Sequence, residues 1–337
     1  MANAVLCGSV NLATREDVFR MVASIAGTSI KRISDGETGD RARWTDAQIP
    51  RLAAMAQLEP ADTPGLVKTA FRLRDGVDAS ELRFDFGYAD AAIESYQVFA
   101  ALKDDGVIAP ETRFQVSLPT VTALTMYIDP SDLGDVWGVM ERDALEQVDT
   151  IAAAIAHDQL AIQWDVAAEI AVVEDYLPNP TGETLADLYD AVARLGAAIP
   201  ADIELGYHLC YGDEPGDDGL GHHFMEPTDT AKLVTFANEL TQRTPRAINW
   251  IHMPVPISRD DDAYYAPLAN LRLAPHTELY LGLVHHEDGI EGAQRRIDTA
   301  AKYTKNFGVA TECGMGRETP DNIPKLLHIQ RDAQVPT

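Results

Sequence analysis

The stretch Ile203-Glu-Leu-Gly-Tyr-His-Leu209 decides the predicted fold. Its apolar and aromatic residues are typical of a short buried strand, and it is flanked by the amphipathic stretches Thr184–Leu195 and Thr228–Thr241, which have helical periodicity. A strand with a helix on either side predicts parallel pairing, because parallel strands are joined by long crossovers that usually contain a helix.

The same strand–helix unit recurs along the chain. The eight expected strands are Ala4–Gly8, Ile30–Ser34, Arg113–Leu118, Leu160–Asp165, Ile203–Leu209, Ile248–Met253, Glu278–Val284 and Gly308–Glu312. The other helical patterns between or after them are Glu16–Ala26, Leu133–His157, Ile290–Tyr303 and Pro320–His328. Eight strands that alternate with helices favour an α/β fold, the (β/α)8 or TIM barrel. An open doubly wound sheet is the alternative, but Gly8-Ser-Val-Asn11 lacks the glycine spacing of a dinucleotide-binding turn.

Residues 44–110 depart from this repeat, because the segment is too long for one crossover. It contains two helical patterns, Ala47–Leu58 and Ala89–Lys103. We interpret it as an inserted helical cap or lid after the second strand, within a single barrel domain that spans residues 1–337.

Composition excludes several classes of partner. The formal net charge of −26 argues against nucleic acid and against an anionic membrane surface. No apolar run is long enough to cross a bilayer, and no basic segment precedes an apolar stretch at the N-terminus, so a cytoplasmic location is expected. Three cysteines without a signal peptide favour metal binding or catalysis over disulfides.

Three residues at predicted strand ends form a candidate zinc site. His208 and Cys210 are two residues apart, so both side chains point to the same face of their strand. Cys313 follows the last strand, just before Gly314-Met-Gly316. The carboxyl ends of all strands meet at one rim of a TIM barrel, so imidazole and two thiolates are expected to bind one Zn²⁺. His252, at the end of the sixth strand, is either a fourth ligand or a hydrogen-bonded rim residue.

Further rim residues suit a substrate. Glu37 follows the second strand and Asp165 ends the fourth, at the rim where carboxylates can bind an ammonium or hydroxyl group. His285 and His286 follow the seventh strand and are candidates for a general acid or base, although only one of two consecutive side chains should point inward. The pair His222-His223 lies in an acidic loop and is interpreted as lid or surface.

Together these motifs resemble the catalytic C-terminal barrel of cobalamin-independent methionine synthases, in the superfamily that includes uroporphyrinogen decarboxylase. The matching residues are Gly8-Ser9, Gly36-Glu37, Gln163-Trp-Asp165, His208-Leu-Cys210 and Glu312-Cys313-Gly-Met. The resemblance implies that Ser9 contacts the carboxylate of a homocysteine-like acceptor and that Glu37 and Asp165 hold its amino group. It departs at the sixth strand, where His252 or a neighbour replaces the family's zinc glutamate.

The resemblance implies a zinc-dependent methyl or alkyl transferase that acts on a small-molecule thiol. The alkyl donor (a folate, a corrinoid or another compound) and the oligomeric state stay open, and the fourth zinc ligand is His252, substrate or water. A zinc-dependent lyase or hydrolase on the same barrel is the alternative. A barrel that binds a metal or thiol without turnover is the third reading, disfavoured by the many ionisable rim residues.

Overall fold

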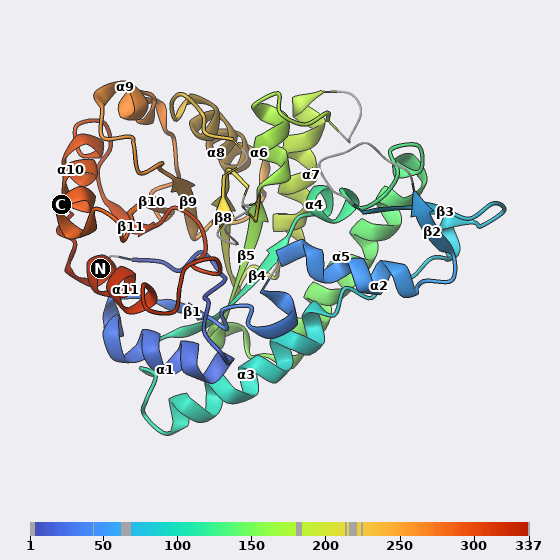
Figure 1. Cartoon of the computed structure of the whole chain (residues 1–337), viewed down its shortest axis with the longest axis horizontal. Helices are drawn as coiled ribbons and strands as arrows, with labels where there is room; N and C mark the ends of the chain where they lie inside the picture. The colour runs from blue at the N-terminus through green and yellow to red at the C-terminus, as the bar shows by residue number, and fades with distance from the viewer. Residues whose placement is uncertain are drawn as a thin grey trace.

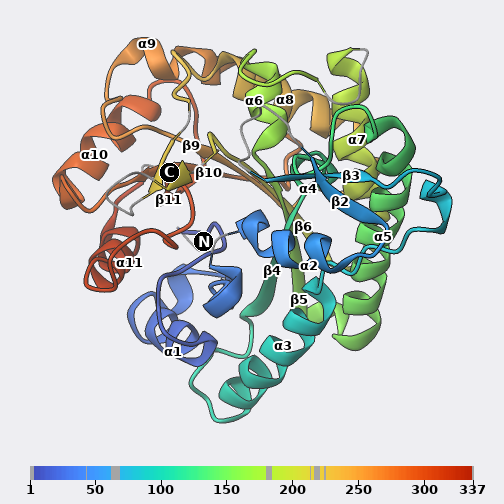
Figure 2. The same cartoon turned by 45° about the vertical axis from the view of Figure 1, so that its right-hand side comes forward.

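The computed structural model describes residues 4–42, 44–61, 69–179, 184–212, 214–215, 221–223 and 225–335. A curled sheet of seven parallel strands lies at its centre, surrounded by helices (Figure 1 and Figure 2). In spatial order the strands are β1 (Arg32–Ser34), β4 (Arg113–Pro119), β5 (Leu160–Val166), β6 (Glu204–Leu209), β9 (Trp250–Pro254), β10 (Glu278–Val284) and β11 (Phe307–Thr311). The predicted α/β class is confirmed, and these strands begin and end within two residues of the expected bounds.

The first expected strand, Ala4–Gly8, forms only isolated bridges. These parallel bridges join Ala4 to Ile30 and Val309, Ser9 to Gly36, and Val10 to Met315. The N-terminal segment therefore lies between the two edges of the curled sheet, where a first barrel strand would lie. A regular eighth strand does not form, and at the end of the segment Gly8 has a φ of 125°, far from the negative φ of extended strands. The observed sheet is thus TIM-barrel-like with seven regular strands.

A ring of long helices covers the outside of the sheet. They are α1 (Arg15–Ile25), α3 (Tyr88–Asp104), α5 (Leu133–Ala154), α7 (Leu185–Ala198), α8 (Ala231–Arg243), α10 (Gly289–Ala300) and α11 (Ile323–Asp332). The first and last of them, α1 and α11, contact each other, which closes the ring. Shorter helices follow several strands: α4 (Val121–Thr125), α6 (Ala168–Val173) and α9 (Asp262–Tyr265). Within the described residues, no helix is long and apolar enough to span a membrane.

The expected insertion at residues 44–110 is not wholly helical. Its last helix, α3, packs against α1, α5 and β4, so it is the ordinary crossover helix of the ring. Before it come α2 (Ile49–Ala54) and an antiparallel pair, β2 (Leu58–Ala61) and β3 (Ala70–Leu73), which project beyond α5 in Figure 1. The backbone of Phe71 in β3 bonds to residues 127 and 129, which anchors this pair to the sheet's α4 connection. Its role as a lid remains a prediction.

The interior of the sheet is closely packed around Trp250. This ring is fully buried in β9, and the guanidinium carbon of Arg32 lies 4.1 Å from its centroid. On the neighbouring strand β6, a Cβ atom added to Gly206 would lie 1.9 Å from the ring. Glycine is therefore required at position 206 so that the two strands can pair with the indole between them.

Gly206→Ala is expected to lower the free energy of unfolding by about 1–3 kcal/mol, because the added methyl group displaces Trp250 in a dense core. Gly138→Ala in α5 is the matched control. Nothing lies near its added Cβ, and alanine restricts the unfolded chain, so this variant should gain about 0.4–1 kcal/mol. Chemical denaturation measures both. Equal changes in the free energy of unfolding for the two variants would contradict the close packing of Trp250 against Gly206.

Candidate functional site

A small pocket of about 60 Å³ opens at the carboxyl ends of the strands. Its lining combines residues from the N-terminal segment with residues that end or follow β1, β5, β6 and β11. They are Cys7, Ser9, Glu37, Ala42, Asp165, Ala167, His208, Cys210, Gly212, Cys313, Gly314, Gly316 and Arg317. The structure thus brings together six residues predicted from the sequence: Ser9, Glu37, Asp165, His208, Cys210 and Cys313.

The predicted metal ligands His208, Cys210 and Cys313 form one compact cluster. Their ligand atoms lie within 4.8 Å of one another. Cys313 Sγ is 3.4 Å from Cys210 Sγ and 3.6 Å from His208 Nε2. In a tetrahedral zinc site with Zn–S of about 2.3 Å and Zn–N of about 2.0 Å, two sulfurs are about 3.8 Å apart and sulfur and nitrogen about 3.5 Å. The spacing and the donor types therefore fit Zn²⁺.

The pKa values of Cys313 and His208 show which protons a bound metal ion would displace. Hydrogen bonding to Cys210 and burial raise the pKa of Cys313 well above its usual value, so without a cation its thiol keeps the proton. Burial lowers the pKa of His208, but the neighbouring Cys7 and Cys313 outweigh burial and raise it well above 6.5. A divalent ion would displace these protons, because thiolate and neutral imidazole are the metal-binding forms.

His252 lies directly behind His208. The two Nδ1 atoms are 2.7 Å apart, and His252 Nε2 is 3.1 Å from the backbone oxygen of Thr311. His252 is fully buried, and burial together with His208 lowers its pKa well below 6.5, so the ring is neutral. A second cluster of possible ligands joins Cys7, His208 and His252. The structure therefore offers two overlapping donor sets that share His208.

Glu37 and Asp165 face the same pocket from different strands. Glu37 has a φ of 51°, in the left-handed region that is unusual outside glycine and often marks a functional site. The turn brings its Oε1 to 3.3 Å from the position a Cβ of Gly8 would take. Asp165 accepts a hydrogen bond of 2.8 Å from Gln163 Nε2, which also donates to the backbone oxygen of Cys7. Gln163 thus holds the Asp165 carboxylate in place, and the turn at Glu37 directs its side chain toward Gly8.

Ser9 is enclosed by the turn that follows β11. The backbone N–H of Met315 donates to the Ser9 carbonyl at 2.7 Å. A Cβ atom at Gly314 or Gly316 would lie 2.3 Å or 2.6 Å from the Ser9 hydroxyl oxygen. Only glycine at these two positions lets the turn approach Ser9 so closely, and the hydroxyl is thereby aimed at the pocket that all three residues line.

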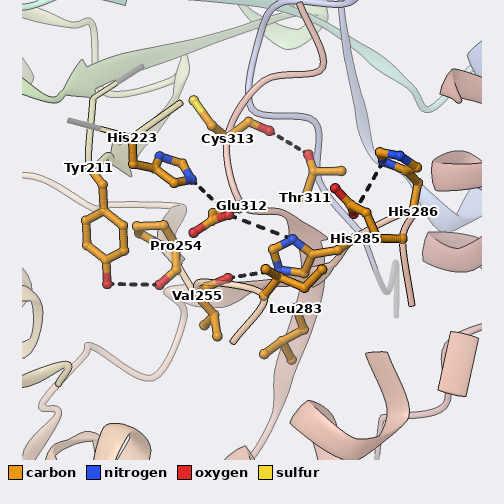
Figure 3. A network of polar contacts seen from close by, with 12 residues as sticks. Tyr211, His223, Pro254, Val255, Leu283, His285, His286, Thr311, Glu312 and Cys313 are labelled. Atoms are coloured by element: carbon orange, nitrogen blue, oxygen red, sulfur yellow. Dashed lines mark hydrogen bonds and ion pairs between the residues drawn. The ribbon is translucent and has the colours of Figure 1, made fainter. Parts of the chain in front are cut away.

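A polar network that sequence reasoning missed lies beside Cys313. Figure 3 shows Glu312 between His223 and His285. His223 Nε2 is 2.9 Å from Glu312 Oε2, and its Nδ1 donates to the backbone oxygen of Gly212 at 3.1 Å. Burial opposes protonation of His223, but Glu312 prevails and raises the pKa of His223 to about 9. The ion pair ties the loop after β6 to the end of β11. Its only sequence signal was a histidine in an acidic loop, which favoured a surface position.

The two candidate acid–base histidines are not among the residues that line the pocket. As expected for neighbours in sequence, they face opposite ways (Figure 3). His285 Nε2 donates to the backbone oxygen of Val255 at 2.9 Å, and its Nδ1 is 3.8 Å from Glu312. Burial and Arg296 lower the pKa of His285 to about 3. His286 Nδ1 lies 3.3 Å from Glu318. A catalytic role for either stays a prediction.

Glu37 makes the stability of the protein depend on pH. Burial and Asp165 raise its pKa to about 8 from an ordinary 4.5, so the folded protein keeps a proton that the unfolded chain releases. Its contribution to stability is present at low pH and is lost as the pH rises from 4.5 to 8. Relative to the wild type, Glu37→Gln should therefore gain in free energy of unfolding over this range, measured by denaturation at several pH values. Glu146→Gln, at an exposed site on α5, is the control. If the difference in free energy of unfolding between wild type and Glu37→Gln stays constant with pH, the raised pKa of Glu37 is refuted.

No protein-family model and no curated protein matches this chain in sequence. Solved structures do match it. A B12-independent methionine synthase from Shewanella sp. W3-18-1 in complex with selenomethionine superposes with a TM-score of 0.64 at 13% identity, over 98% of this chain and 96% of that one. A Listeria monocytogenes protein assigned as a vitamin-B12-independent methionine synthase gives 0.56 at 15% identity, over 94% and 86%. A methyltransferase from Methanosarcina mazei gives 0.51 at 10%, over 98% and 94%. The chain has the fold of the cobalamin-independent methionine synthases, and the resemblance predicted from its motifs is confirmed at the level of the fold.

Proposed function

We propose that this protein is a zinc-dependent methyl or alkyl transferase whose acceptor is a small thiol with an amino-acid-like head. One observation carries the proposal: a single pocket combines two cysteines and a histidine at zinc-ligand spacing with two carboxylates and a serine. The shared fold supports it, since the similar structures include a methionine synthase and a methyltransferase.

His208, Cys210 and Cys313 would hold the metal. When bound, zinc would lower the pKa of a thiol that coordinates it, so that thiolate is available at neutral pH. Two cysteine thiolates balance the charge of a divalent ion, which leaves an acceptor sulfur electron-rich enough to attack an alkyl carbon. His208 and Cys210 are buried, and these surroundings would limit the access of water to that sulfur.

Glu37 and Asp165 would bind the ammonium group of the acceptor. Asp165 is held by Gln163, so its carboxylate would not need to reorganise when the acceptor enters. The left-handed turn at Glu37 places the second carboxylate beside the same pocket. A positive ammonium would also stabilise the anion of Glu37, offsetting the burial that raises its pKa to about 8. The Ser9 hydroxyl, held by the Gly314–Gly316 turn, would donate to the acceptor's carboxylate. The Shewanella structure contains selenomethionine, a ligand of this head-group chemistry.

The alkyl donor is proposed only by its chemical class. Ala167 forms part of the pocket wall after β5, where the methionine synthase motif has a proline, so this wall differs from that motif on the donor side. A folate, a corrinoid or another activated alkyl compound would each need its leaving group protonated. His285 and His286 remain the predicted acids, and His285 Nδ1 lies 3.8 Å from Glu312, the residue before Cys313.

Zinc binding tests the first half of the proposal. Wild-type protein should bind one zinc per chain, measured by metal analysis and chelator competition. Cys210→Ser and His208→Gln should each lose more affinity than the about 10- to 100-fold typical of losing an outer hydrogen bond. His157→Gln is the control, since this histidine precedes β5 and pairs with exposed Asp202. Absence of stoichiometric zinc in wild type, with no effect of Cys210→Ser, would rule out the site.

Acceptor selectivity tests the second half. Zinc-loaded protein should bind homocysteine at least about tenfold more tightly than 4-mercaptobutanoate, which lacks only the amino group, because an ammonium–carboxylate hydrogen bond contributes about 1.5–3 kcal/mol. Glu37→Gln and Asp165→Asn should shrink this ratio, while the control Glu318→Gln, outside the pocket lining, should not. Calorimetric titration measures the affinities. Normal zinc content with no binding of either thiol would instead favour the lyase or hydrolase reading.

A further inference from the structure

Both ring nitrogens of His252 already have partners. His252 Nε2 is 3.1 Å from the carbonyl oxygen of Thr311. A carbonyl oxygen only accepts hydrogen bonds, so this nitrogen carries a proton and donates it. The other nitrogen, Nδ1, is 2.7 Å from Nδ1 of His208. At this distance the two nitrogens form a hydrogen bond, so one of them carries a proton and the other accepts it.

The position of that proton follows from the burial of the pair. His252 is fully buried in β9, and a second proton would make it a buried cation next to the ligand set for a metal cation. With its single proton on Nε2, His252 presents a bare Nδ1 that accepts from Nδ1–H of His208. The remaining nitrogen of His208, Nε2, is the one that lies 3.6 Å from Cys313 Sγ.

We propose that His252 is a positioning residue and not the fourth zinc ligand: it fixes the tautomer and ring angle of His208 so that His208 Nε2 faces the cysteines. This inference rests on the proposed zinc function. The chain of bonds runs from the Thr311 carbonyl through His252 to His208, and Thr311 is two residues from Cys313. One strand end thus anchors both the thiolate and, through His252, the imidazole. Metal-binding histidines commonly have such an outer hydrogen-bond partner, most often a carboxylate or a carbonyl.

The consequence is an open coordination position. His252 has no lone pair left for a metal at the cysteine pair, so protein side chains in this set supply three ligands. Three protein ligands and an open fourth position are the pattern of catalytic zinc sites, whereas structural sites are closed by four. The fourth position would then be taken by the acceptor thiol.

Wild-type protein loaded with ¹¹³Cd²⁺ and labelled with ¹⁵N-histidine gives a direct test. Coupling between ¹¹³Cd and ¹⁵N is expected for His208 Nε2 alone, and His252 should be the neutral Nε2–H tautomer with and without metal. Coupling to either nitrogen of His252, or an Nδ1–H tautomer of His252, overturns the proposal. Failure to bind any metal would refute the proposed zinc function, while the tautomers of the metal-free protein would still test the order of the hydrogen bonds.

Variants separate positioning from ligation. His252→Ala should weaken zinc binding about 10- to 100-fold while the visible spectrum of the Co²⁺-loaded protein stays that of the wild type. His252→Asn should restore most of the affinity, because its amide oxygen can accept from His208 where Nδ1 stood. His208→Gln is the reference for a lost ligand and should change the spectrum. A Co²⁺ spectrum of His252→Ala that matches His208→Gln, or no rescue by asparagine, would overturn the inference.

Discussion

The site depends on the parallel register of the central strands. Asp165 in β5 is paired with His208 in β6, and His208 is paired with His252 in β9. Residues in register on adjacent parallel strands are neighbours at one height of the sheet, about 4.8 Å apart. The carboxylate proposed for the substrate, the imidazole proposed for the metal and the imidazole behind it therefore form one row. A shift of one residue in any of these strands would turn its side chain to the opposite face and dismantle the row.

The two edges of the sheet contribute the rest. The N-terminal segment bridges β1 and β11, and this brings Ser9 against the Gly314–Gly316 turn and Glu37 over Gly8. Residues more than 300 positions apart in sequence thereby meet in one pocket. Gly8, whose backbone departs from strand geometry, also leaves room for the Glu37 carboxylate because it has no Cβ.

Sequence patterns predicted most of the sheet because its strands are short apolar runs bounded by polar loops. The His-x-Cys spacing and the Cys-Gly-x-Gly turn located the metal cluster for the same reason: strand alternation fixes which side chains share a face. The pattern did not separate α3 from the inserted segment, since a helix in the outer ring and a helix in a cap have the same periodicity. Nor did it identify the pair His223–Glu312, which joins a loop to a strand end and follows no spacing rule.

His208 shows why ligand type alone does not define a metal site. Counting donors gives two overlapping sets, one with Cys210 and Cys313 and one with Cys7 and His252, and both are chemically plausible for zinc. The hydrogen bonds of His252 distinguish them: its Nε2 donates to the Thr311 carbonyl and its Nδ1 accepts from His208, so this ring has no free lone pair for a metal. The Thr311 carbonyl would therefore select the set with Cys210 and Cys313 by fixing the proton on His252. In the proposed zinc site, the backbone at the end of β11 would thus determine the metal position.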